Sequence, residues 1–127
     1  MESNIDTYNI AKRWILEDER PHVVGLDFCG NPHKNRFQDY LDPIFNDAKE
    51  SGIKTTLHCA EIQDVHEENE AILEYNPDRL GHCVHLTEEQ LKSIAEKKIP
   101  VEICISSNVA TNSYATVYQL PHLSILH

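Results

Sequence analysis

The segment His58-Cys59-Ala60-Glu61 places two side chains with chemical potential close together. The imidazole of His58 can donate a nitrogen to a zinc ion, and the carboxyl group of Glu61 can transfer a proton. The same spacing also fits a partly buried histidine bonded to backbone, followed by a solvated loop glutamate. His58 is therefore a candidate metal ligand and Glu61 a candidate proton-transfer group. Their surroundings in the fold decide between this role and a purely structural one.

A second candidate is the segment Arg79-Leu80-Gly81-His82. A glycine beside a histidine lets backbone or a ligand approach closely, which would leave the imidazole facing a cleft. The alternative is a small residue packed under a helix, with the histidine at the rim of a strand. Other polar groups follow apolar runs in the same way, namely Asp27 with Gly30, and Ser106 and Ser107 with Asn108.

Short apolar runs predict β-strands, and amphipathic segments predict helices between them. The predicted strands cover residues 23–28, 53–58, 79–82 and 100–105. One predicted helix covers residues 5–19, with Trp14 on its apolar face. Another covers residues 37–48, and either it is kinked at Pro43 or it starts there with Asp42 as its cap. Two more helices are expected to begin at N-caps formed by Asp64 and Thr87, whereas residues 106–113 are expected to be polar loop.

This alternation predicts an α/β fold in which about four parallel strands are joined by right-handed helical crossovers. The carboxyl ends of parallel strands share one edge of the sheet, and active sites are built there, above all in (β/α)8 barrels. We expect Asp27, His58, Arg79 and His82 to lie at that edge. Several strands that deliver such groups to one edge favour an enzyme.

The composition limits which binding partners and which cell compartment we expect. A chain of 127 residues suits one domain, and a net charge of −10 repels nucleic acid and anionic membrane surfaces. The four cysteines form no C-x-x-C pair, and the N-terminus lacks a secretory signal. We therefore expect a cytoplasmic protein whose cysteines are small buried thiols rather than zinc ligands.

Taken together, these segments resemble the adenosine deaminase family of zinc-dependent amidohydrolases. Residues 23–30 resemble the family's V-V-G-x-D-x-x-G strand, and residues 58–61 resemble its H-x-x-E strand. Residues 79–82 resemble R-[IL]-G-H, and residues 101–108 resemble [FVL]-E-[IL]-C followed by S-N. The order and the spacing agree, and the resemblance is greatest to the branch of N6-methyl-AMP deaminases.

The resemblance implies part of a TIM (β/α)8 barrel over residues 1–110 and a divergent tail over residues 111–127. It also implies hydrolytic deamination of purine nucleosides or nucleotides, adenosine or N6-methyl-AMP, with one zinc ion. His58 would be a zinc ligand, Glu61 would protonate the purine N1, and His82 would orient or deprotonate the attacking water. The backbone N–H of Gly30 would bond a purine ring nitrogen, and Asp27 would support that loop.

The chain departs from the family at the metal. The family's zinc is held by an H-x-H pair, a histidine and an aspartate, but this sequence contains no H-x-H and no D-D pair near its C-terminus. It keeps one expected ligand, His58, whereas a catalytic zinc needs about three. The alternative hypothesis is therefore a non-catalytic half-barrel. Such a piece would expose two sheet edges, at 23–28 and 101–105, and we expect it to self-associate.

Overall fold

The computed structural model describes residues 2–19, 21–34 and 36–111. The elements are α1 (Glu2–Glu17), β1 (Gly25–Phe28), α2 (Gln38–Tyr40), η1 (Leu41–Asn46), α3 (Asp47–Glu50), β2 (Lys54–Cys59), α4 (His66–Tyr75), β3 (Arg79–His82), α5 (Glu88–Lys97), β4 (Val101–Glu102) and α6 (Ile105–Ala110). The predicted tail, 111–127, lies outside the described residues apart from Thr111. Among the described helices, none is long and apolar enough to span a membrane.

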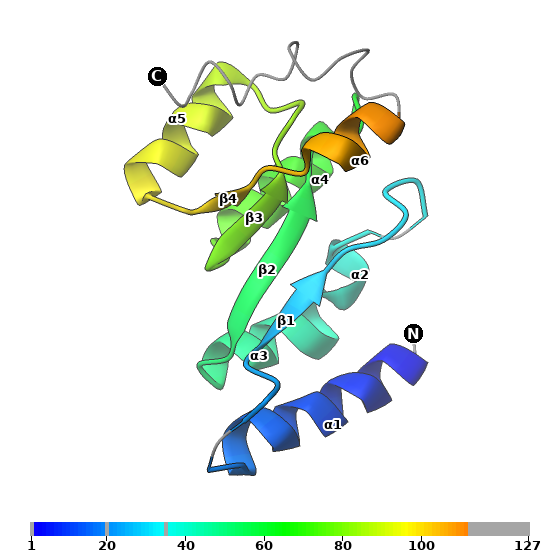
Figure 1. The fold of residues 1–127 in the computed structure, drawn as a ribbon, viewed down its shortest axis with the longest axis vertical. Helices are drawn as coiled ribbons and strands as arrows, with labels where there is room; N and C mark the ends of the chain where they lie inside the picture. Colours follow the sequence, from blue (N-terminus) through cyan, green and yellow to red (C-terminus); the bar gives the residue numbers. More distant parts are fainter. Residues whose placement is uncertain (1, 20, 35, 112–127) are drawn as a thin grey trace.

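The strands form one parallel sheet in the order β1-β2-β3-β4, so the predicted α/β fold is confirmed (Figure 1). The register pairs Gly25 with Lys54 and Leu57 with Leu80, and Leu80 also pairs with Val101. Because the strand order follows the chain, β1 and β4 are the edge strands of the described sheet, as predicted. Helices α3 and α4 contact β2 and lie behind the sheet in Figure 1.

An aromatic cluster fills the core between the sheet and the helices behind it. It consists of Phe28, Phe37, Tyr40, Phe45 and Tyr75, whose neighbouring ring centroids lie 5.2–6.0 Å apart. Tilted and edge-on contacts at these distances are favourable for aromatic rings. The apolar face predicted for residues 37–48 is therefore confirmed as the face that packs on the sheet.

The helical segment between β1 and β2 passes through Pro43 without ending. Proline lacks an N–H group, and its ring clashes with the carbonyl four residues earlier in an α-helix. The segment accommodates both by widening into the π-helix η1, which runs from Leu41 to Asn46 between α2 and α3. The helix therefore does not start at Asp42, and Pro43 lies within its π-helical turn.

Helix α1 packs by one side, and part of its predicted apolar face is exposed. Tyr8 is buried and its hydroxyl donates a hydrogen bond to Asp47, which also pairs with Lys12 at 2.7 Å. Trp14, which was also predicted on the apolar face, is in contrast 60% exposed. The helical spacing identified the apolar face of α1, but only the part of that face next to α3 and η1 is packed against other residues.

Two further local predictions are corrected, and one is confirmed. The N-cap of α4 is Val65, which makes no side-chain capping bond, and Asp64 precedes it with a φ of 63°. The stretch after β4 is not a loop throughout, since α6 covers Ile105–Ala110. The capping box of α5 is present, with Thr87 Oγ1 accepting from the Gln90 N–H at 3.2 Å.

Candidate active site

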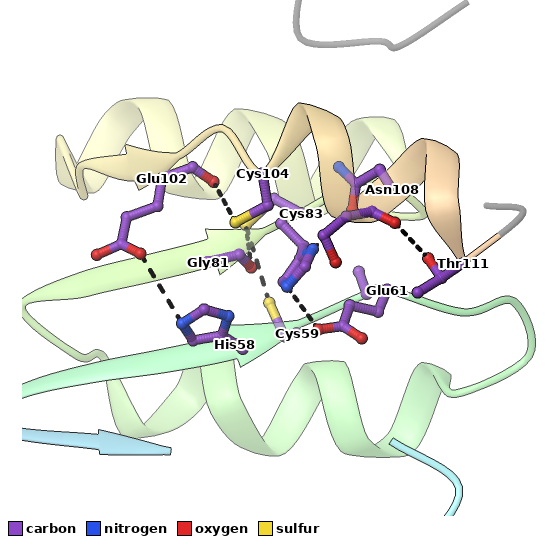
Figure 2. A network of polar contacts seen from close by, with 12 residues as sticks. His58, Cys59, Glu61, Gly81, Cys83, Glu102, Cys104, Asn108 and Thr111 are labelled. Carbon is purple, nitrogen blue, oxygen red and sulfur yellow. Dashed lines mark hydrogen bonds and ion pairs between the residues drawn. The ribbon is translucent and has the colours of Figure 1, made fainter. Parts of the chain in front are cut away.

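A strand-end cluster of His58, Glu61, His82 and Asn108 forms the candidate site. His58 lies near the end of β2, Glu61 follows that strand, and His82 is the last residue of β3. Asn108 reaches them from α6, which crosses above the ends of these strands in Figure 2. The structure thus brings together His58, Glu61 and His82. It adds Asn108, one of the polar residues noted after the last predicted strand, from a segment that was predicted to be loop and is a helix.

His82 makes one short contact from each ring nitrogen. Its Nε2 lies 2.5 Å from Glu61 Oε1, and its Nδ1 lies 2.6 Å from Asn108 Oδ1. The histidine is 4% exposed and Asn108 is completely buried, so water does not compete for these contacts. The imidazole is therefore held from both sides, by an amide oxygen and by a carboxyl group.

These contacts determine where hydrogens must lie. An amide oxygen only accepts, so the contact with Asn108 Oδ1 requires a hydrogen on Nδ1 of His82. The contact between Nε2 and Glu61 then needs a second hydrogen, supplied either by a Glu61 carboxylic acid or by an imidazolium. In both forms the Glu61–His82 contact holds a proton that could pass to a substrate.

Gly81 makes the space for the His58 imidazole. Gly81 and His58 are register partners on β3 and β2, and a Cβ at Gly81 would lie 2.6 Å from His58 Nδ1. The glycine of this motif therefore admits the neighbouring strand's histidine ring, rather than a ligand or a helix as the sequence suggested. This pairing across strands ties the two sequence motifs together.

The outer nitrogen of His58 is buried and unsatisfied. Among the described residues, Nε2 has no hydrogen-bond partner, although Asp27 Oδ1 lies 3.4 Å away and Glu102 Oε2 lies 3.8 Å away. A buried polar atom without a partner is costly, and in native proteins it signals a function or a bound group. Figure 2 shows Glu102 reaching toward this ring from β4.

His58 Nε2 is the donor atom that a zinc ion could take up, because both ring nitrogens of His82 already make close contacts. Ligand atoms of His58, His82 and Cys104 all lie within 4.8 Å of one another. Imidazole nitrogen and thiolate sulfur are the ligands that zinc favours, and His58 is the residue whose nitrogen has no other bond. Cys104 was expected to be only a small buried residue, and its position inside the E-[IL]-C motif was the signal that could have found it.

The backbone is strained where the cluster is assembled. Ala60, His82 and Cys83 have φ values of 53°, 63° and 55°, a region that residues with a Cβ rarely adopt. The Ala60 N–H donates to Asn69 Oδ1 at 3.0 Å, and the Ala60 carbonyl accepts from the His85 N–H at 3.0 Å. Such strain persists only where the surroundings hold it, and it gathers at functional sites.

Two buried thiols lie beneath the cluster. Cys59 Sγ and Cys83 Sγ are 3.8 Å apart and both side chains are buried. The hydrogen bond with Cys83 and the burial of the thiol raise the pKa of Cys59 well above its usual value. The prediction of small buried thiols is therefore confirmed for this pair, but it is wrong for Cys29, which is exposed.

Gly30 borders the same hollow as His58 and Glu61. The hollow lies between the loop after β1 and the end of β2, and its far wall includes Glu68. Gly30 has a φ of 143°, which favours glycine, and it is exposed. Burial raises the pKa of Glu68, although that carboxylate accepts the Phe37 N–H at 2.6 Å. The position of Gly30 suits a backbone contact to a ligand in this hollow.

Arg79 is not at the predicted edge. It begins β3, whereas His82 ends it, so the two lie toward opposite ends of the strand. Its Nε contacts Glu102 Oε1 at 2.6 Å and Thr56 Oγ1 at 3.2 Å. Arg79 therefore positions the glutamate that approaches His58, instead of joining the strand-end cluster itself.

A parallel α/β sheet with histidine and glutamate at its carboxyl edge agrees with the face on which (β/α)8-barrel enzymes build their active sites. The family model for adenosine deaminase matches residues 6–127. The chain belongs to the adenosine deaminase family. Its described sheet is a run of consecutive strands from that family's TIM barrel.

Known relatives point to one branch of the family. The chain is 31% identical to N6-methyl-AMP deaminase of Mus musculus over 95% of its length, and 34% identical to N6-mAMP deaminase of Arabidopsis thaliana over 91%. It covers 37% and 31% of those proteins, so it spans about a third of their length. The crystal structure of Arabidopsis ADAL complexed with IMP matches 98% of the chain, with a TM-score of 0.84 and 31% identity, and the chain covers 35% of it.

Proposed function

We propose that the strand-end cluster belongs to the active centre of a zinc-dependent hydrolytic deaminase whose substrate is a purine nucleotide of the N6-methyl-AMP type. The observation that carries the proposal is the Glu61–His82 contact of 2.5 Å beside the unsatisfied nitrogen of His58. Support also comes from the relatives named N6-methyl-AMP deaminase and from the Arabidopsis structure with IMP. IMP carries an oxygen at C6, as the product of this reaction must.

Each residue then has a distinct task. His58 would hold the zinc ion through Nε2, and a bound zinc ion supplies a water acidic enough to attack near neutral pH. His82 would orient that water and accept its proton as the oxygen bonds to C6. Glu61 would donate a proton to N1 of the ring. As the C6–N bond breaks, His82 would pass its proton to the departing amine, and the remaining hydroxyl proton would return to Glu61. The Gly30 N–H would fix the ring by a hydrogen bond.

The sequence supplies only part of the metal centre. It has no H-x-H pair, so the ligands that would complete the zinc site in the family pattern are not in these 127 residues. The second candidate function, a non-catalytic half-barrel, follows from the same observation. The deaminase and the half-barrel hypotheses differ in one expectation: only a deaminase cluster should catalyse deamination once the remaining strands of the barrel are supplied.

A chimera makes this test. Residues 6–111 would replace the corresponding segment of the Arabidopsis N6-mAMP deaminase, which contributes the rest of the barrel. We expect the chimera to convert N6-methyl-AMP to IMP, and the Glu61→Gln chimera to lose this activity. A folded chimera that binds zinc but makes no IMP, beside an active parent enzyme, would refute the proposed function.

The 127-residue chain by itself gives the complementary result. We expect negligible release of ammonia or methylamine from adenosine, AMP or N6-methyl-AMP, even with added zinc. Elemental analysis should find less than one tightly held zinc per chain, because His58 lacks its family partners. Turnover that Glu61→Gln abolishes would show that the chain completes its own centre.

We also propose that the chain self-associates through its edge strands and that it acts in the cytoplasm. The strands β1 and β4 are edges of the described sheet, and Val24 and Ile103 beside them are 69% and 39% exposed. Unpaired apolar edges promote association, and free thiols suit a reducing compartment. Light scattering over a concentration series tests the first proposal, and imaging of a fluorescently tagged chain tests the second.

A further inference from the structure

Asn108 is the one member of the strand-end cluster for which the proposed function has no task. It lies on α6, a helix of six residues, and it is completely buried. Its side-chain Oδ1 faces His82 Nδ1 at 2.6 Å, while its Nδ2 has no hydrogen-bond partner among the described residues. A buried amide with one unsatisfied end is poorly explained as a stabilising residue, because that end is left desolvated.

We propose that Asn108 is a positioning residue that holds the His82 imidazole with its hydrogen on Nδ1, so that Nε2 faces the reaction. The amide oxygen can only accept, so a ring that contacts it must donate from Nδ1. In the neutral ring the lone pair is then on Nε2, the nitrogen that faces Glu61. The role in deamination rests on the proposed function, whereas the hydrogen position does not.

The direction of the amide is what decides the tautomer. If Asn108 were turned over, its Nδ2 would donate to His82 Nδ1, and the ring hydrogen would move to Nε2. In that state Nε2–H would donate to a Glu61 carboxylate, and His82 could not accept a proton from water. Which ring nitrogen carries the hydrogen is therefore a measurable consequence of the contact at 2.6 Å.

A buried asparagine elsewhere in the chain provides a matched control. Asn69 on α4 is 1% exposed and also uses its Oδ1, but it accepts from the Ala60 backbone N–H at 3.0 Å. Asn69→Leu and Asn108→Leu remove the same group from equally buried positions and leave side chains of similar volume. Only the second substitution removes an acceptor from an imidazole.

The experiment is a long-range ¹H–¹⁵N correlation spectrum of histidine rings in the full 127-residue chain, treated with a chelator. The His82 signals are identified as those missing from His82→Gln. We expect Nδ1 of His82 to give a protonated, pyrrole-type shift in the parent chain, in Asn108→Asp and in Asn69→Leu. In Asn108→Leu the shift should move toward the unprotonated, pyridine type. An unprotonated Nδ1 in the parent chain, or an unchanged shift in Asn108→Leu, would overturn the proposal.

Kinetics in the Arabidopsis chimera then test the role in the reaction. Asn108→Leu should lower kcat within the range of about 10²–10⁴-fold that general acid–base groups contribute, with KM little changed. Asn108→Asp, which keeps an acceptor oxygen, should restore most of kcat. Equal losses in Asn108→Asp and Asn108→Leu would refute the positioning role. An inactive parent chimera would instead count against the proposed function, and the ring spectrum would still decide the tautomer.

Discussion

The aromatic cluster and the strand-end cluster are packed by opposite rules. Rings of the aromatic cluster contact one another from several sides, and the Tyr75 hydroxyl donates to the Phe45 carbonyl at 2.9 Å. In the strand-end cluster, by contrast, His58 Nε2 and Asn108 Nδ2 have no hydrogen-bond partner within the part of the chain that the structure describes, and the backbone beside them is strained. Burial therefore stabilises the aromatic cluster, whereas in the strand-end cluster burial leaves polar atoms without hydrogen bonds, which costs stability.

This difference indicates how the molecule divides stability from function. Strain and unsatisfied groups lower the free energy of unfolding, and the surrounding structure must offset them. Residues of the aromatic cluster should therefore control stability when they are changed. Residues of the strand-end cluster should control metal binding and reactivity, with small or even favourable effects on stability. The following predictions test that division, from the largest expected effect to the smallest.

The largest effect is expected at Glu61 and His58 in the Arabidopsis chimera. Glu61→Gln should lower kcat by about 10²–10⁴-fold and leave the zinc content intact, because Glu61 acts on the substrate. His58→Ala should lose both zinc and activity, because its imidazole would bind the metal directly. Initial rates and elemental analysis measure both. Zinc lost in Glu61→Gln but kept in His58→Ala would reverse the two assignments.

The next effect is expected in the aromatic cluster. Phe37 is completely buried and contacts three other rings, so Phe37→Ala should lower the free energy of unfolding by about 3–5 kcal/mol. Urea denaturation followed by circular dichroism measures it. Glu61→Gln serves as the comparison from the other cluster and should change stability by less than about 1 kcal/mol. Similar losses in both variants would contradict the division.

A smaller effect is expected at Gly81, where the two motifs meet. The Cβ of Gly81→Ala would lie 2.6 Å from His58 Nδ1, so the imidazole must move. Overpacking of this kind costs about 1–3 kcal/mol, and the shift should also weaken zinc binding in the chimera. Gly52→Ala offers a control, since no atom lies within 4 Å of a Cβ there, although its φ of 72° adds strain. Weaker zinc binding in Gly52→Ala as well would show that the effect is not local.

The smallest effect is expected at Asp78, far from both unsatisfied atoms. Partial burial raises its pKa, but hydrogen bonds from the Lys54 ammonium and the Thr55 N–H outweigh this and lower the pKa below 3.8. A lowered folded-state pKa contributes stability that is present above 3.8 and is lost as the pH falls through the lower value. The contribution should be below about 1 kcal/mol because the pair is largely exposed.

Urea denaturation of the parent chain and of Asp78→Asn, from neutral pH to about pH 2.5, measures this term. The difference between them should be constant at neutral pH and should shrink as the solution is acidified below the ordinary carboxyl pKa. Exposed Glu74 on α4 provides a control substitution, Glu74→Gln. A difference that grows with acidification would give the opposite sign and would contradict the ionic role of Asp78.

The sequence by itself determined the parallel sheet, the helices that cover it and the family. Apolar residues at regular spacing show which face of an element is buried, and this information is local. The face with Phe37 and Phe45 and the capping box at Thr87 were both read correctly for that reason. The four motifs also placed His58 and His82 at strand ends before any contact between them was known.

The tertiary structure alone decided which groups meet. Strand register sets the His58 ring over Gly81, and the direction of β3 carries Arg79 to the other end of the strand. Helix α6 is too short to be stable alone, so no local sequence pattern predicted it. The contact between Asn108 and His82 depends on that helix and was not predicted either. Such contacts join residues that are more than twenty positions apart, and their geometry follows from packing rather than from spacing along the chain.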